Sequence, residues 1–398
     1  MDLLDKLQAV AQRVASFSDG PMPFDTVVEE ALGPTEVVIA GRRTLMCGSN
    51  NYFGLSFHPA VMSAARDAID RDGTGTTGSR AANGTFAGHR RLENTFADIY
   101  GKRHALIFTT GYQANLGMIS GLCGPADTVL LDVESHASIY DGARLSGGQV
   151  FAFRHNSPDD LARKLARQPN GRRCLVVVEG LYSISGDVAP LVEIVAACRD
   201  AGAVLMVDEA HSFGAYGAHG LGCAEAQGVL GEVDFVVGTF SKALAGVGGY
   251  CVSNHPELKL LHFTARPYVF TASGSPASIA GVEAALTLLR TDGAMRGRLW
   301  DNVRRVRAGL GRMGFTTGDT ESPIVTIEIG SAERTVAMWR ALLESGVYTN
   351  IVLPPACRPD ACLLRTSYSS AHTPEQIDFA LAAFKTVGRA LSVIDEAA

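Results

Sequence analysis

The sequence contains no uninterrupted apolar run of about 20 residues, the length that a membrane-spanning helix needs, although 46% of its 398 residues are hydrophobic. We therefore expect no transmembrane segment. Residues 1–16 alternate charges with apolar residues and lack a basic stretch followed by an apolar core, so we expect no signal peptide. These absences favour a cytoplasmic protein and leave peripheral contact with a membrane open.

The sequence also has no sustained basic stripe, and its formal net charge is −6. General nucleic-acid binding depends on such a stripe, so this class of function is excluded. The eight cysteines form no CxxC pair and no cluster with the spacing of metal ligands, so we expect no metal site. Several cysteines lie inside apolar runs, which is typical of small buried side chains in a reducing compartment.

From residue 100 onward, short apolar runs alternate with segments that have the 3.6-residue period of amphipathic helices. Continuous Val, Leu and Ile strands separated by helices predict an α/β fold with a mostly parallel sheet, covered on both faces. The seven expected strands span residues 105–109, 128–132, 150–153, 174–179, 203–208, 234–238 and 249–253.

The rest of the chain predicts smaller parts on either side of this sheet. Residues 1–50 contain a helix and a short hairpin, and two helical stretches follow the sheet between 276 and 312, with a break near Thr291-Asp292-Gly293. Three strands and two further helices then predict a small α+β unit. We expect an N-terminal segment (1–50), a large domain (51–275) and a smaller C-terminal domain (276–398).

Two of the expected strands end in side chains that suit pyridoxal phosphate. Lys242 follows one strand in Gly238-Thr239-Phe240-Ser241-Lys242, and Asp208 ends another, three residues before His211. Open α/β sheets bind ligands at the carboxyl ends of their strands. A lysine amine can hold the aldehyde as a Schiff base, and a carboxylate can keep the ring nitrogen protonated. The alternative for Asp208 is a helix N-cap.

Other strand ends add an anion site and a partner for the ring. Thr109-Thr110-Gly111-Tyr112 opens a helix after a strand, where backbone N–H groups favour a phosphate, and Ser241 adds a hydroxyl. His136 follows a third strand and could stack on the ring or move a proton. Glu179-Gly180-Leu181-Tyr182-Ser183 repeats the pattern at the end of another strand. An ordinary turn and a structural histidine are the alternatives, but polar residues at five strand ends favour one shared site.

Arg365 lies inside an apolar C-terminal strand, where a buried guanidinium needs an anion. A substrate carboxylate bound by two hydrogen bonds is one candidate, and a structural salt bridge is the other.

Together these residues resemble the α-oxoamine synthase family of fold-type I pyridoxal phosphate enzymes, over nearly the whole chain from about residue 51 to 390. The motifs that carry the resemblance are Asn51-Tyr52-Phe53-Gly54, Gly78-Ser79-Arg80, Asn83-Gly84-Thr85, Thr110-Gly111-Tyr112-x-Ala114-Asn115, Ser135-His136-Ala137-Ser138, Glu179-Gly180-x-Tyr182-Ser183, Val207-Asp208-Glu209-Ala210-His211 and Gly238-Thr239-Phe240-Ser241-Lys242.

The resemblance implies a homodimer with a shared active site at the subunit interface. It implies Lys242 as the covalent anchor, Asp208 on the pyridine nitrogen, His211 on the phenolic oxygen and His136 stacked on the ring. The further cofactor contacts that it implies are Gly111, Tyr112, Ser183, Thr239 and Ser241, with Thr271 and Ser273 reaching the partner's phosphate. The expected substrate contacts are Asn51 and Arg365, with Arg358 as the nearest stand-in for an arginine that the family branch carries at position 353.

Within the family, the chain most resembles the bacterial branch that condenses L-serine with palmitoyl-CoA. This implies a decarboxylative Claisen-type condensation giving 3-ketodihydrosphingosine, CoA and CO2, the first step of sphingolipid biosynthesis. The sequence departs from the branch at Leu353, where an arginine is usual, and at Asn50, where a tyrosine is common. A sister synthase that uses alanine or glycine, a carrier protein as acyl donor, a fold-type I aminotransferase and a non-catalytic subunit are the alternatives; Lys242 argues against the last.

Overall fold

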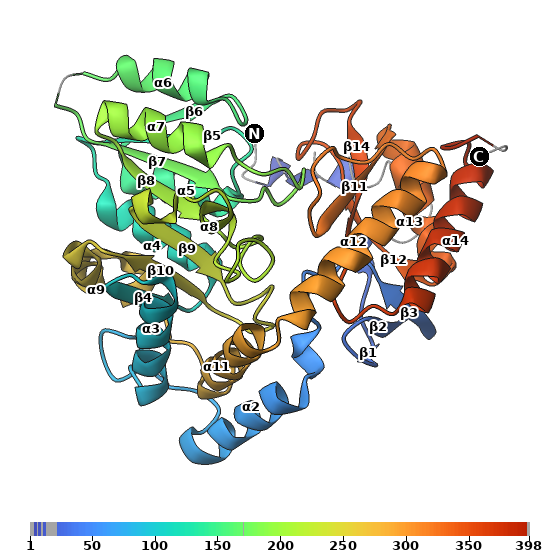
Figure 1. Ribbon diagram of the computed structural model, residues 1–398, viewed down its shortest axis with the longest axis horizontal. Helices are drawn as coiled ribbons and strands as arrows, with labels where there is room; N and C mark the ends of the chain where they lie inside the picture. Colours follow the sequence, from blue (N-terminus) through green and yellow to red (C-terminus); the bar gives the residue numbers. More distant parts are fainter. Residues whose placement is uncertain (1–3, 6, 9–10, 13–21, 170, 396–398) are drawn as a thin grey trace. The chain divides into compact units, whose positions relative to one another are not determined.

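The computed structural model describes residues 4–5, 7–8, 11–12, 22–169 and 171–395, and the chain divides into two compact units (Figure 1). The larger unit contains Phe53–Ser183 and Asp187–Gly297, and the smaller contains Met1–Tyr52, Ile184–Gly186 and Arg298–Ala398. The helix expected near the N-terminus falls largely outside the described residues.

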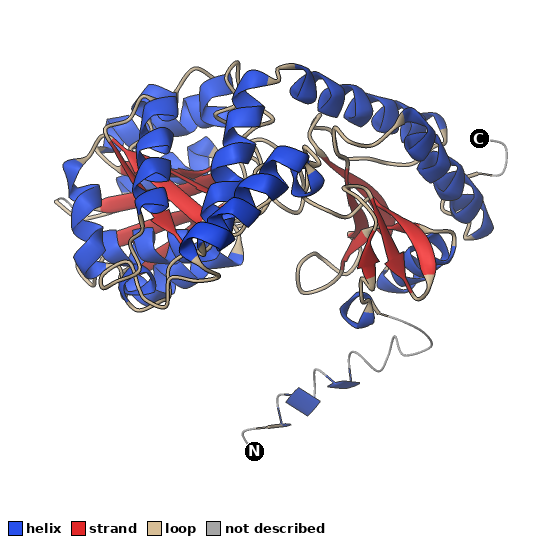
Figure 2. Cartoon of the chain, turned by 90° about the horizontal axis from the view of Figure 1, so that it is seen from below, coloured by secondary structure: helices blue, strands red, loops and turns tan. Residues whose placement is uncertain are grey.

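The larger unit is built on a seven-stranded sheet flanked by helices (Figure 2). Its strands from β5 to β9 pair in parallel, and β10 is antiparallel to both β4 and β9. The expected mostly parallel sheet is therefore confirmed. In spatial order the strands are β4 (His104–Phe108), β10 (Gly249–Ser253), β9 (Phe235–Thr239), β8 (Val204–Asp208), β7 (Cys174–Glu179), β5 (Thr128–Asp132) and β6 (Gln149–Phe153).

The central strands are buried along nearly their whole length, which explains their continuous apolar sequences. Helix α4 (Gly111–Leu122) packs against α5 (Ala137–Ser146), and side chains such as Met118 and Ile139 join strand residues such as Val177 in one core. The other crossover elements are α6 (Pro158–Ala166), α7 (Leu191–Ala201), α8 (Cys223–Ala226) and η3 (Leu230–Glu232).

Helices at the start and end of the larger unit pack on one another. Helix α11 (Pro276–Thr291) lies along α2 (Pro59–Asp72) and contacts α3 (Ala87–Tyr100). Because of this packing, the larger unit continues past residue 275, where the sequence places a boundary, to Gly297. Shorter helical segments are η2 (Leu55–Phe57), η4 (Pro256–Leu260), α9 (Leu261–Thr264) and α10 (Arg266–Val269).

The smaller unit combines two short sheets with helices. The expected N-terminal hairpin is present, and its second strand β3 pairs in parallel with β12, so the hairpin joins the C-terminal part of the chain. A second sheet has the order β11-β14-β13. The elements are η1 (Pro23–Asp25), β1 (Glu30–Ala31), β2 (Glu36–Ile39), β3 (Arg42–Met46), β11 (Ile324–Gly330), α13 (Ala332–Glu344), β12 (Val347–Tyr348), β13 (Asn350–Val352), β14 (Cys362–Ser367) and α14 (Pro374–Ala390), with α12 (Ala294–Arg312) beginning in the larger unit. None of the helices in the described part of the chain combines the length and apolar character that a membrane span requires.

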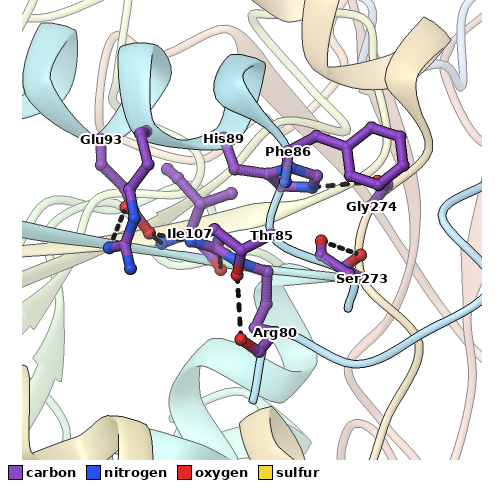
Figure 3. Close-up of polar contacts among 10 residues, drawn as sticks. Arg80, Thr85, Phe86, His89, Glu93, Ile107, Ser273 and Gly274 are labelled. Carbon is purple, nitrogen blue, oxygen red and sulfur yellow. Dashed lines mark hydrogen bonds and ion pairs between the residues drawn. The ribbon is translucent and has the colours of Figure 1, made fainter. Parts of the chain in front are cut away.

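A buried ion pair ties the segment before α3 to the sheet (Figure 3). Arg80 Nη2 lies 2.8 Å from Glu93 Oε1, and the two side chains are 3% and 5% exposed. Arg80 also donates to the Ile107 carbonyl of β4 (3.2 Å) and to the Thr85 hydroxyl (3.1 Å). The Ile107 N–H donates to Glu93 in turn (3.3 Å), so both charged side chains are hydrogen-bonded to the backbone of β4.

We expect Glu93→Leu to lower the free energy of unfolding by about 3–5 kcal/mol, because it leaves the Arg80 charge buried without its carboxylate. The double variant Arg80→Met/Glu93→Leu should lose less, since neither charge then remains. Urea unfolding followed by circular dichroism measures both. Arg91→Met, which removes an exposed pair with Glu283 at 3.5 Å, is the control and should cost no more than about 1 kcal/mol. Equal losses for the single and double variants would contradict the expectation.

Candidate active site

A cavity of about 330 Å³ lies in the larger unit at the carboxyl edge of the large sheet. The ends of β7, β8 and β9 and the start of α4 form its wall. Eight of the predicted site residues line it, so the structure brings most of the predicted cofactor site together: Gly111, Tyr112, His136, Asp208, His211, Thr239, Ser241 and Lys242.

Asp208 ends β8 with its carboxylate almost fully buried. One oxygen accepts the Ala210 N–H (2.9 Å), and the other accepts the side-chain amide of Asn115 (2.7 Å). Glu179 stands opposite Asp208 in the register of β7 and β8, and it is buried too. Burial and the Asp208 charge raise the pKa of Glu179 to about 8. Two neighbouring carboxylates cannot both ionise easily in this environment, so Glu179 holds a proton at neutral pH.

Lys242 is displayed by a tight turn after β9. The turn is closed by the Ala245 N–H, which donates to the Lys242 carbonyl (3.1 Å), and by the Gly246 N–H, which donates to the Phe240 carbonyl (2.9 Å). The Phe240 side chain is fully buried and stacks on Phe96, with ring centroids 5.5 Å apart. The apolar anchor at Phe240 therefore fixes the backbone from which the lysine amine extends into the cavity.

The start of α4 forms one end of the cavity. Thr110 caps this twelve-residue helix by accepting the Gln113 N–H (3.1 Å), so its first backbone N–H groups face the cavity wall. Gly111 is required here, because a Cβ at this position would lie 2.6 Å from Thr239 Cβ. Thr239 and Ser241 place their hydroxyls 2.9 Å apart beside it.

His136 supplies an aromatic wall at the start of α5. Its backbone N–H donates to Glu179 Oε1 (2.5 Å), and its ring meets the Tyr112 ring edge to face, with centroids 6.5 Å apart. The Tyr112 hydroxyl donates to Asp141. Burial lowers the pKa of His136, which favours the neutral imidazole.

These residues fit pyridoxal phosphate in shape and charge. Gly111 has no side chain beside Thr239, and the backbone N–H groups at this start of α4 suit a phosphate. The buried Asp208 carboxylate matches a protonated ring nitrogen. Lys242 offers an amine to the aldehyde within the same cavity.

Three predicted cofactor contacts lie outside the cavity wall. Ser183 contacts Glu179 through its backbone N–H. The Ser273 hydroxyl donates to the Gly84 carbonyl (2.6 Å) and lies 2.6 Å from the Thr76 hydroxyl. The Thr271 hydroxyl accepts the Gln113 side-chain amide (3.1 Å). The cofactor roles of Ser183, Thr271 and Ser273 stay predictions.

The predicted substrate contacts lie in the smaller unit. Arg365 is buried in β14 and donates to Asn50 Oδ1 (3.1 Å) and to Ser367 Oγ (3.2 Å). Asn50, one of the two positions that depart from the branch pattern, is thus a direct partner of this arginine. Arg358 is exposed and pairs with Asp360 at 3.3 Å, and the Asn51 N–H donates to Ser49. The substrate roles of Asn51, Arg358 and Arg365 stay predictions.

The cavity is also lined by residues that are not among the predicted site residues, and three of them carry polar side chains that interact with the predicted ones: Asn115, Ser138 and Glu179. Glu179 carries a signal in the sequence, because it ends a buried strand as Asp208 does. Asn115 lies four residues after Gly111 and therefore on the same face of α4. Ser138 belongs to the motif Ser135-His136-Ala137-Ser138, but the motif alone does not show that its hydroxyl contacts the His136 ring.

A charged histidine, His155, connects two loops beside this cavity. His155 Nδ1 lies 2.8 Å from Asp132 at the end of β5, and Nε2 lies 3.0 Å from Asp187. Burial alone would lower the pKa of His155, but hydrogen bonds to Asp132 and Asp187 and their charges outweigh it and raise the pKa to about 10. An imidazolium therefore joins the loop that leads to His136 with the loop that follows β7.

The chain matches the aminotransferase class I and II family over residues 44–384. The chain belongs to this family. Serine palmitoyltransferase from Caulobacter vibrioides is 49% identical over 99% of this chain and 98% of its own length. These comparisons confirm the expected α-oxoamine synthase resemblance.

Two solved structures of family members show the same fold. Sphingomonas wittichii serine palmitoyltransferase has a TM-score of 0.97 and 46% identity, covering 99% of this chain and all of its own. A variant of the S. paucimobilis enzyme with a bound PLP–myriocin aldimine has a TM-score of 0.96 and 45% identity, with the same coverage. The expected fold-type I architecture is therefore confirmed.

We expect the contacts of His155 with Asp132 and Asp187 to make the free energy of unfolding depend on pH. Because the folded pKa is raised from about 6.5 to about 10, the stabilisation is complete below pH 6.5, falls as the pH rises and is lost above 10. His155→Gln should therefore cost most at pH 6, at most about 5 kcal/mol, and little at pH 10.5.

Urea unfolding of the wild type and His155→Gln at pH 6, 8 and 10.5 measures this difference. His219→Gln is the control, because the His219 side chain is 81% exposed and pairs with Glu225 at the surface. A cost of His155→Gln that is the same at all three pH values would show that the imidazolium charge does not act as inferred.

Proposed function

We propose that this chain is a pyridoxal phosphate-dependent acyltransferase that condenses L-serine with palmitoyl-CoA. The products are 3-ketodihydrosphingosine, CoA and CO2, which makes the reaction the first step of sphingolipid biosynthesis. The observation that carries the proposal is the full-length match to the Caulobacter serine palmitoyltransferase, with Lys242, Asp208 and His136 in one cavity.

When bound, pyridoxal phosphate supplies an electron-withdrawing ring that stabilises negative charge on the amino-acid α-carbon. Lys242 holds the aldehyde, Asp208 holds the proton of the ring nitrogen, and the start of α4 at Gly111 holds the phosphate. Thr239 and Ser241 add hydroxyls beside that phosphate, and His211 lies within reach of the ring from the same cavity wall.

The Lys242 amine is the base that removes the α-proton of serine. The α-carbon then forms a bond to the acyl carbon, and CoA leaves as a thiolate that takes a proton from solvent. The serine carboxyl departs as CO2, and the proton held by Lys242 returns to the same carbon. His136 faces these charges from the cavity wall and stabilises them by hydrogen bonding.

We further propose a homodimer in which Thr271 and Ser273 approach the partner's phosphate. Asn51, Arg365 and Arg358 are the candidates for holding the amino-acid carboxylate. Supporting this role, Arg365 is a buried guanidinium in β14 that donates to Asn50 and Ser367, and the planar fork of a guanidinium matches a carboxylate.

A sister synthase that uses alanine or glycine is the second candidate. The observation that favours it is the contact between Arg365 and Asn50, because this partner of the arginine departs from the branch pattern. Product mass separates the two candidates, since serine keeps a hydroxymethyl group that alanine and glycine lack.

We expect purified protein with pyridoxal phosphate to show a visible absorbance band that L-serine shifts more strongly than L-alanine or glycine. With palmitoyl-CoA, serine should release CoA and give a product of the mass of 3-ketodihydrosphingosine. Lys242→Ala should lose the band of the resting protein and reduce turnover at least about 1000-fold, because both the anchor and the base are gone.

Lys259→Ala, which changes an exposed lysine in η4, is the control and should behave as the wild type. If alanine or glycine alone drove CoA release, serine would be the wrong substrate and the sister-synthase function would replace it. Formation of a keto acid without consumption of acyl-CoA would instead indicate an aminotransferase.

A further inference from the structure

A chain of hydrogen bonds connects Asp208 to His136 across the floor of the cavity. Asn115 Nδ2 donates to Asp208 Oδ2 (2.7 Å) and to Ser138 Oγ (2.9 Å). Ser138 Oγ lies 2.7 Å from His136 Nδ1. Asn115 and Ser138 are 2% and 1% exposed, so no solvent competes for these contacts. The two residues that face opposite parts of the cofactor site are thus linked through two neutral side chains.

The orientation of Asn115 is set by the carboxylate. If its amide were turned over, the carbonyl oxygen would face Asp208 Oδ2 at hydrogen-bond distance, and two acceptors would repel each other. The amide nitrogen therefore faces Asp208, and its second hydrogen is directed to Ser138. The Ser138 hydroxyl accepts this hydrogen, which leaves its own proton for another acceptor.

Two donors converge on His136 Nδ1. The Ser138 backbone N–H, which can only donate, points at this nitrogen from 3.2 Å, as part of the cap of α5. The Ser138 hydroxyl proton has Nδ1 as its acceptor at 2.7 Å. A proton on Nδ1 would face the backbone N–H head on. The Nδ1 lone pair must therefore be free of a proton, and a neutral ring carries its hydrogen on Nε2.

We propose that Asn115 and Ser138 are positioning residues that hold His136 as the neutral imidazole with its hydrogen on Nε2. The hydrogen-bond directions stand on the geometry alone, whereas the consequence for the reaction rests on the proposed function. His136 then acts on the reactants as a hydrogen-bond donor and not as a base.

The charges around His136 agree with a neutral ring. Burial lowers its pKa most, Asp208 raises it, Lys242 lowers it, and Asp141 raises it by a smaller effect. A neutral imidazole that gave up its Nε2 proton would become an unstable anion, so His136 stabilises charge without transferring a proton. The proton that leaves and returns at the amino-acid α-carbon is then carried by Lys242.

Nitrogen NMR of protein labelled with 15N-histidine tests the proposal directly. The two ring-nitrogen signals of His136 are identified by their loss in His136→Gln. In the wild type at pH 7.5, we expect them to show an unprotonated Nδ1 and a protonated Nε2. This should hold with and without pyridoxal phosphate, because the hydrogen-bond chain lies within the protein. The cofactor-free measurement does not depend on which amino acid is the substrate.

Variants of the hydrogen-bond chain should change this signature. In Ser138→Ala and Asn115→Leu, we expect a measurable population with the proton on Nδ1, and Ser138→Thr should restore the wild-type pattern. Turnover of Ser138→Ala should fall about tenfold with the KM for serine changed less than about twofold, as for a lost transition-state interaction. Thermal unfolding verifies that the variants are folded.

Ser135→Ala is the matched control, because this serine lies in the same loop and its buried hydroxyl has no hydrogen-bond partner among the described residues. It should leave the His136 signals and turnover unchanged. A cationic His136 at pH 7.5, a proton on Nδ1 in the wild type, or folded Ser138→Ala and Asn115→Leu proteins with an unaltered His136 signature would each overturn the proposal. If the signature is as expected but serine drives no CoA release, the hydrogen-bond assignment stands and the proposed function fails.

Discussion

The buried carboxylate of Asp208 is the charge on which the cavity depends. It lies next to Glu179 in the register of two parallel strands, and both are shielded from water. Because burial disfavours the charged form and the Asp208 charge opposes a second anion, the pKa of Glu179 rises to about 8 and this carboxyl retains its proton. The remaining negative charge is held in place by Asn115 and the Ala210 N–H and faces a cavity that also contains Lys242. Cofactor binding and acid–base assignments follow from this one arrangement.

Parallel strands explain why so much of this site is visible in the sequence. Each strand of the large sheet is covered on both faces, so it appears as a continuous apolar run, and polar residues at its carboxyl end stand out. Lys242, Asp208 and His136 were predicted on this basis, and the structure brings them into one cavity. The strands themselves were placed within one or two residues of β4 to β10, and the hairpin of β2 and β3 was placed as well.

Features that depend on contacts between distant segments could not be predicted in the same way. Helices α2 and α3 were not predicted, although α2 packs on α11 more than 200 residues later. The roles of Asn115 and Ser138 depend on hydrogen bonds across 93 and 23 residues of chain. His155 is a similar case, because its partners Asp132 and Asp187 come from two other loops. A lone histidine in a sequence gives no sign that two carboxylates enclose it.

The proton assignments of the cavity restrict the chemistry that it can perform. With Glu179 protonated and His136 neutral, neither of these two groups brings a charge to the cavity that Asp208 and Lys242 also line. Asp208 accepts hydrogen bonds from two N–H donors, and in the proposed function it faces the ring nitrogen. Under that proposal, proton transfer at the substrate falls to Lys242, while His136 and Glu179 are neutral hydrogen-bonding groups.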